Sequence, residues 1–193
     1  TMIRTGLFFG SFNPIHIGHM VIANYMIEFS DLDQLWFVVS PHNPLKEKKT
    51  LLKGYHRLEM VRLAIEGDDR FRESDIEFHM PRPSYTIDTL TYLEEKNRGR
   101  KFLLVMGSDG LKNFHKWKNA HLIEQKYHRL IYPRPGTDRE STSGVPNATL
   151  MDAPLMDISS SFIRSAIRQG KDVRHMVPPK AYRFLHDMHF YEE

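Results

Sequence analysis

The sequence contains no cysteine, which excludes disulfide bonds and thiolate metal sites. It also has no apolar run long enough to span a bilayer and no signal-peptide pattern at its start, so we expect a cytoplasmic protein without a membrane partner. The formal net charge is only +3, which is too weak to indicate a nucleic-acid-binding protein but allows a local basic cleft for phosphates. The phosphate-loop pattern GxxxxGK[ST] and the zinc motif HExxH do not occur.

The composition of the chain is that of a folded protein. Hydrophobic residues make up 40% and charged residues 26% of its 193 residues, which argues against extensive disorder. This length suits one domain with a substantial core. We therefore predict a single domain over residues 1–193, with a C-terminal helical segment from about residue 158.

The most informative stretch is residues 6–19, GLFFGSFNPIHIGH. The apolar run at residues 3–9 predicts a buried strand, and a helical pattern begins at about Gly18. A helix start offers N–H groups and the positive end of the helix dipole to an anion. His16 and His19 are three residues apart, which puts two imidazoles on one side of that helix start. The stretch therefore predicts a phosphate-binding site.

Other interpretations of this stretch stay open. A histidine at a helix start can simply cap the helix or be half-buried. A pair of histidines can bind a metal ion, although no third ligand lies at a suggestive spacing here. Gly10 and Gly18 would let a polyphosphate approach the backbone closely, which favours the phosphate site.

Strand and helix patterns alternate along the rest of the chain. Strands are predicted at residues 35–39, 71–78, 101–106, 129–132 and 148–151, and helices at residues 20–29, 55–65, 84–90 and 180–190. This alternation predicts an α/β fold, a doubly wound and mostly parallel sheet with helices on both faces. Ligands bind such sheets beyond the carboxyl ends of the strands, so we expect Lys46 and Asp109 on the same rim as the two histidines.

Residues 10–19, GSFNPIHIGH, resemble the (T/H)xGH signature of the nucleotidylyltransferase superfamily together with its preceding GxFxP element. Further matches follow in family order: PHNPLK at 41–46, SYTIDTL at 84–90, GSD at 107–109, RPG at 134–136 and ISSSFIR at 158–164. Ser161 stands where the family usually has threonine, and the hydroxyl is kept. Together these motifs most resemble the bacterial nicotinate-nucleotide adenylyltransferases, which have a Rossmann-like fold.

The resemblance implies roles for particular residues. Catalytic roles fall on His16, His19, Lys46 and Arg164. The residues implied to bind ATP are Gly10, Ser11, Phe12, Gly18, Gly107, Asp109, Ile158, Ser159, Ser160 and Ser161. Those implied to bind the mononucleotide are Ser84, Tyr85, Thr86, Asp109, Trp117 and Arg134, with Trp117 stacking on the pyridine ring.

Several of these residues also have ordinary structural explanations. Ser84 or Thr86, Asp109 and the serines at 159–161 would all make good helix caps. Trp117 would serve as a packing anchor on a short helix.

The resemblance implies the transfer of the adenylyl group of ATP to nicotinate mononucleotide, giving nicotinate adenine dinucleotide and pyrophosphate. Mg²⁺ would be bound through the substrate phosphates and not by a protein metal site. The helix start near Thr86 suits an anionic nicotinate better than a neutral nicotinamide. Nicotinamide mononucleotide, a phosphopantetheine-type acceptor, and a non-catalytic nucleotide- or RNA-binding module on the same fold remain alternatives. The sequence leaves a homo-oligomer open.

Overall fold

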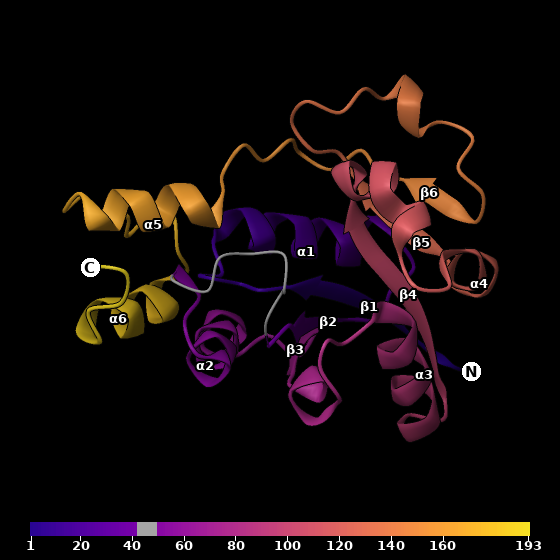
Figure 1. Cartoon of the computed structure of the whole chain (residues 1–193), viewed down its shortest axis with the longest axis horizontal. Helices are drawn as coiled ribbons and strands as arrows, with labels where there is room; N and C mark the ends of the chain where they lie inside the picture. Colours follow the sequence, from indigo (N-terminus) through magenta and orange to yellow (C-terminus); the bar gives the residue numbers. More distant parts are fainter. Residues whose placement is uncertain (42–49) are drawn as a thin grey trace.

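The structure is a computed structural model that describes residues 1–41 and 50–193. Its centre is a six-stranded sheet with the order β3-β2-β1-β4-β5-β6 (Figure 1). The strands are β1 (Ile3–Gly10), β2 (Gln34–Val39), β3 (Phe71–Ser74), β4 (Arg100–Gly107), β5 (Arg129–Tyr132) and β6 (Ala148–Leu150). Neighbouring strands pair in parallel throughout this sheet. The predicted doubly wound α/β fold is confirmed.

Helices connect and cover the strands. The α-helices are α1 (Ile17–Phe29), α2 (Gly54–Ile65), α3 (Thr86–Lys96), α4 (Ala120–Lys126), α5 (Ser160–Arg168) and α6 (Pro179–Asp187). The described residues also form the 3₁₀ helices η2 (Ile76–His79), η3 (Ser108–Lys116) and η4 (Glu140–Thr142). Figure 1 shows α5 and α6 together at the left, beside the C-terminus, with α3 and α4 at the right. None of these helices is long and apolar enough to cross a membrane.

The central strands are apolar on both faces because helices cover both sides of the sheet. Alternate residues of a strand point to opposite faces, so Leu7 of β1 joins one hydrophobic cluster and Phe8 joins the other. In β2, Trp36 and Phe37 divide in the same way. This burial on both faces explains why these strands appear in the sequence as continuous apolar runs.

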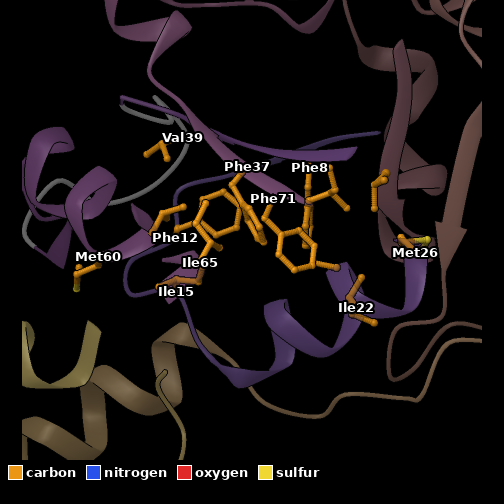
Figure 2. Packing of buried hydrophobic residues seen from close by; sticks show 14 of the residues in the cluster. Phe8, Phe12, Ile15, Ile22, Met26, Phe37, Val39, Met60, Ile65 and Phe71 are labelled. Carbon is orange, nitrogen blue, oxygen red and sulfur yellow. The ribbon is translucent and has the colours of Figure 1, made fainter. Parts of the chain in front are cut away.

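The larger cluster fills the space between the sheet and helices α1, α2, α5 and α6. Figure 2 shows four phenylalanines of this cluster gathered above α1. The ring centroids of Phe8 and Phe12 are 5.7 Å apart, and that of Phe37 lies 5.4 Å from Phe12 and 5.9 Å from Phe71. The second cluster lies under α3 and α4. The first core therefore reaches the loop that carries the predicted phosphate site.

Two local expectations differ from the structure. The strand predicted over residues 71–78 ends at Ser74, and η2 follows it. This turn buries the carboxylate of Glu77, which accepts hydrogen bonds from the hydroxyls of Ser84 (3.2 Å) and Thr89 (3.0 Å). The helix predicted near residue 84 begins at Thr86, and its N-cap residue is Tyr85, which makes no side-chain cap bond. The prediction that Ser84 or Thr86 is the cap is therefore wrong.

Candidate active site

The strand order reverses between β1 and β4, and parallel sheets bind ligands at such a point. A cleft of about 730 Å³ opens there. It is lined by these residues with predicted roles: Gly10, Ser11, Phe12, His16, Gly18, His19, Asp109, Arg134, Ile158, Ser159, Ser160, Ser161 and Arg164. The structure thus brings residues from both ends of the chain into one cleft.

His16 and His19 cap helix α1 for each other. The backbone N–H of His19 donates to Nδ1 of His16 (3.4 Å), and the backbone N–H of His16 donates to Nδ1 of His19 (3.1 Å). The two rings are stacked, with their centroids 3.7 Å apart. The predicted cap is therefore present, and it holds both imidazoles in the cleft.

The caps also fix the tautomer of each ring. A neutral imidazole has one nitrogen that accepts a hydrogen bond and one N–H that donates. Because Nδ1 of both His16 and His19 accepts from the backbone, we assign the ring proton to Nε2 in each. Both rings line the cleft, so their Nε2–H groups are the donors that they can offer to a phosphate oxygen.

Burial keeps both imidazoles neutral. Burial and, to a smaller extent, the charge of Arg134 together lower the pKa of His16 from 6.5 to about 4. Burial also lowers the pKa of His19 well below its usual range, with smaller effects from His16 and Arg134. The ring of Phe12 lies edge-on to His19 with the centroids 5.0 Å apart, which helps to exclude water. An anion in the cleft would oppose this lowering of the pKa.

We expect the stability of the ligand-free protein to fall as the pH is lowered from about 6.5 to about 4. In that range the unfolded chain protonates His16 whereas the folded protein does not. Because the folded pKa lies below the unfolded one, His16 alone removes roughly 2 kcal/mol from the free energy of unfolding between pH 7 and pH 5. Urea unfolding of the parent and of His16→Asn at both pH values measures this. An equal pH dependence in the two proteins would contradict the assignment.

A buried arginine holds the loops next to the histidines. Arg57 of α2 is fully buried and donates to the carbonyl oxygens of Leu52 (2.8 Å), Ser11 (2.7 Å), Ser40 (2.6 Å) and Pro41 (2.7 Å). Burial lowers its pKa to about 10, so the guanidinium still carries its charge at neutral pH. Arg57 therefore joins the chain beyond β1 to the chain beyond β2.

The sequence prediction missed this residue. Residues four apart lie on the same side of a helix, so Arg57 shares the buried side of α2 with Val61 and Ile65. An arginine on the apolar side of an amphipathic helix was the signal that could have identified it.

Helix α5 contributes the other end of the cleft. Its N-cap is Ser159, whose hydroxyl accepts a hydrogen bond from the N–H of Phe162 (3.1 Å). The hydroxyl of Ser160 donates to the carbonyl oxygen of Pro14 (2.9 Å), and Nη1 of Arg164 donates to that of Asn13 (2.9 Å). Ser160 and Arg164 therefore tie α5 to the loop between β1 and α1.

The glycines of the motifs make room mainly for protein atoms. A Cβ on Gly18 would lie 2.5 Å from Ile158 and 2.8 Å from the His16 ring, and one on Gly10 would lie 3.0 Å from the Phe12 ring. This reason differs from the predicted one, which was close approach of a polyphosphate. Gly107 does not line the cleft, and a Cβ there would lie 2.5 Å from the Asp109 carboxylate. Asp109 is not the N-cap of η3, because Gly107 holds that position and Asp109 lies in the first turn.

The predicted mononucleotide residues divide into two groups. Asp109 and Arg134 line the cleft, whereas Ser84, Tyr85, Thr86 and Trp117 do not. Trp117 packs on Phe114, with the ring centroids 5.1 Å apart, and lines a separate cavity of about 1110 Å³. Lys118, which follows Trp117 in the sequence, contacts the start of α3: its ammonium lies 2.9 Å from the Asp88 carboxylate and 4.8 Å from the centroid of the Tyr85 ring.

Lys46 lies outside the described residues, so its predicted contact with phosphate stays a prediction. The residues that the structure describes contain no cluster of three or more His, Cys, Asp or Glu side chains that could hold a metal ion. The cleft does offer the carboxylate of Asp109 beside hydroxyl and imidazole groups. This set fits an ion that takes most of its ligands from phosphate oxygens and water.

Comparison with known proteins agrees with this parallel sheet and the position of its cleft. A family model described as cytidylyltransferase-like matches residues 7–166. The chain is 46% identical to a "Probable nicotinate-nucleotide adenylyltransferase" of Flavobacterium johnsoniae, over 99% of this chain and 100% of the relative. It is 48% identical to the protein of the same name from Bacteroides fragilis, over 93% of this chain and 90% of the relative.

A solved structure shares the fold at lower identity. The Plasmodium falciparum nicotinic acid mononucleotide adenylyltransferase complexed with NaAD matches with a TM-score of 0.82 and 20% identity, over 98% of this chain and 97% of that one. The chain belongs to the cytidylyltransferase-like family and, within it, to the nicotinate-nucleotide adenylyltransferases. The family expected from the motifs is confirmed.

Proposed function

We propose that the protein transfers the adenylyl group of ATP to nicotinate mononucleotide, releasing pyrophosphate and forming nicotinate adenine dinucleotide. The observation that carries this proposal is the stacked pair of His16 and His19 at the start of α1, in one cleft with Arg164 and the start of α5. Two helix starts, two neutral imidazole donors and a guanidinium suit a polyphosphate. The curated relatives carry the name of this activity.

The chemistry needs no covalent change in the protein. An oxygen of the mononucleotide 5′-phosphate attacks the α-phosphorus of ATP, and the bond from that phosphorus to the bridging oxygen breaks as pyrophosphate leaves. The protein positions the reactants and stabilises the charge that builds on the leaving group. The Nε2–H groups of His16 and His19 and the guanidinium of Arg164 supply the donors for that charge. Lys46 enters the proposal through its motif alone.

Mg²⁺ would neutralise part of the phosphate charge and would be held chiefly by the phosphates, with Asp109 as the nearby carboxylate. The residues of the chain orient the triphosphate around it. Asp109 and Arg134 lie on the side of the cleft where the second substrate would enter, and their charged groups are 3.8 Å apart. A ribose hydroxyl could bond to this carboxylate, since carboxylates accept strong hydrogen bonds.

The start of α3 is our candidate site for the pyridine carboxylate. Its N-cap residue, Tyr85, makes no side-chain cap bond, which leaves the helix start available to an anion. The acid of the first turn, Asp88, is paired with Lys118, which offsets its repulsion of a second anion. Trp117 precedes this lysine and places an aromatic ring in the same region. These features favour nicotinate over nicotinamide.

We expect pyrophosphate release from ATP to require an added mononucleotide and to be about fivefold more efficient with nicotinate than with nicotinamide mononucleotide, since a charge at a helix start is worth roughly 1 kcal/mol. Thr86→Val lowers the efficiency with nicotinate mononucleotide. The matched control is Thr91→Val on the same helix, whose hydroxyl donates to the carbonyl oxygen of Ile87. A preference for the amide would contradict the acceptor assignment, and release without any acceptor would contradict adenylyl transfer.

Three wider expectations belong to the proposal. We place the reaction in the cytoplasm, in keeping with a chain that has no cysteine. We expect no nucleic acid to bind, since the net charge of +3 is small. The residues from 1 to 193 would act as one domain, because both hydrophobic clusters pack on a single sheet.

A further inference from the structure

The segment that follows α6 turns back toward the cleft. His189 and Tyr191 have φ angles of +55° and +68°, a region that residues other than glycine adopt only when their surroundings hold them there. The N–H of Phe190 donates to the carbonyl oxygen of Leu185 (3.1 Å), and its ring lies 4.7 Å from that of His56 on α2. These contacts hold the turn against the body of the protein.

The turn delivers the Tyr191 hydroxyl to Asn13, which lies within the GSFNPIHIGH motif. The hydroxyl donates to Oδ1 of Asn13 at 2.6 Å. The same amide donates from Nδ2 to the carbonyl oxygen of Thr50 (2.8 Å), and its Oδ1 accepts from the N–H of Leu52 (3.3 Å). The backbone carbonyl of Asn13 is the one that Arg164 holds. Asn13 is thus a junction between the loop of His16 and three other segments.

The Tyr191 hydroxyl stays protonated and is therefore always able to donate this hydrogen bond. Burial raises the pKa of Tyr191, and the nearby charges of Arg164 and Arg57 lower it to a smaller extent. The phenol therefore keeps its proton at neutral pH and donates a hydrogen bond to Asn13. The Asn13 side chain is itself 5% exposed, so an amide oxygen that loses this donor has little water to replace it.

We propose that Tyr191 is a positioning residue for ATP, one that acts through Asn13 on the loop between β1 and α1. This inference rests on the proposed function only for the identity of the triphosphate. Asn13 lines the cleft, and the loop that it braces leads directly into His16. Removing the hydroxyl leaves the Asn13 amide held by Thr50 and Leu52 alone, so the loop between β1 and α1 loses its contact with the C-terminal turn. ATP then binds to a less ordered set of hydrogen-bond donors, whereas the side of the cleft that takes the mononucleotide is unchanged.

The test is Tyr191→Phe, which keeps the ring and removes the hydroxyl. We expect the affinity for ATP, measured by calorimetry without acceptor, to fall about fivefold, as for the loss of one buried hydrogen bond. The KM for the mononucleotide should stay unchanged. The control is Tyr182→Phe on α6, whose hydroxyl donates to the exposed Asp172. An unchanged ATP affinity in Tyr191→Phe, or an equal loss in Tyr182→Phe, would overturn the proposal.

A double-mutant cycle separates positioning from general loss of stability. In an Asn13→Ala background the Tyr191 hydroxyl has lost its acceptor, so Tyr191→Phe should then change ATP affinity by less than about twofold. A full fivefold loss in that background would show that Tyr191 does not act through Asn13. Because the readout is ATP binding without turnover, it also stays informative if the protein binds ATP and transfers no adenylyl group. ATP binding without adenylyl transfer would refute the proposed function but not the positioning role of Tyr191.

Discussion

His16→Ala or His19→Ala lowers the turnover number roughly 100-fold or more, as does the loss of one preorganised transition-state donor in other enzymes. Each substitution removes an Nε2–H that the mutual capping of the pair aims into the cleft. The charge that these donors stabilise grows as pyrophosphate leaves, so turnover falls more than ATP affinity does. Steady-state kinetics with saturating ATP and nicotinate mononucleotide measure the effect.

Two variants show whether the loss comes from the missing donor. His16→Asn keeps a good N-cap for α1 but lacks the imidazole Nε2, so we expect its turnover to collapse while its stability at pH 7 stays near that of the parent. His128→Ala removes a histidine that precedes the start of β5, at the amino end of the strands and away from the cleft at their carboxyl ends, and should leave turnover unchanged. A turnover number within about twofold of the parent in His16→Ala and in His19→Ala would rule out their catalytic role.

Arg57→Met lowers the free energy of unfolding by roughly 2–4 kcal/mol, because four carbonyl oxygens lose their donor at once. For a chain of 193 residues this corresponds to a decrease in Tm of about 10 °C. Turnover also falls at temperatures where the variant is folded, since Arg57 joins the loops beyond β1 and β2. Calorimetry and kinetics at 25 °C measure the two effects separately.

The same helix offers a matched control. Arg62 lies on α2 but is exposed, and it pairs with Glu59 at 2.6 Å. Exposed pairs of this kind contribute little to stability, so Arg62→Met should lower Tm by no more than about 3 °C. If the two variants lose the same stability, the four carbonyl bonds of Arg57 are not what hold these loops.

The sheet and much of the cleft could be predicted from sequence because their signals are local. The strands β1, β2 and β4 are buried on both faces and so form continuous apolar runs. The GSFNPIHIGH and ISSSFIR motifs each combine a helix start with its own polar residues, which a short window of sequence contains. Helix starts at the carboxyl ends of parallel strands share one rim, and this topological rule places both motifs in one cleft.

What the sequence did not predict depends on contacts between distant segments. The bonds of Arg57 to Ser11 and Pro41 span 46 and 16 residues, and no periodicity in the sequence reports them. The end of β3 at Ser74 follows from the burial of Glu77 beside Thr89, which overrides the alternation of residues 71–78. Tertiary contacts of this kind routinely decide where a weak local pattern ends.

The hydrogen bonds between α5 and the loop after β1 have a consequence for protein synthesis. Ser160 and Arg164 bond to residues that precede them by 146 and 151 positions, and Tyr191 bonds to one that precedes it by 178. A growing chain therefore contains the strands and the two histidines long before it contains the residues that close the cleft over them. Because the larger hydrophobic cluster also takes residues from α5 and α6, the cleft is completed, and a nucleotide can bind, only after these helices have been synthesised.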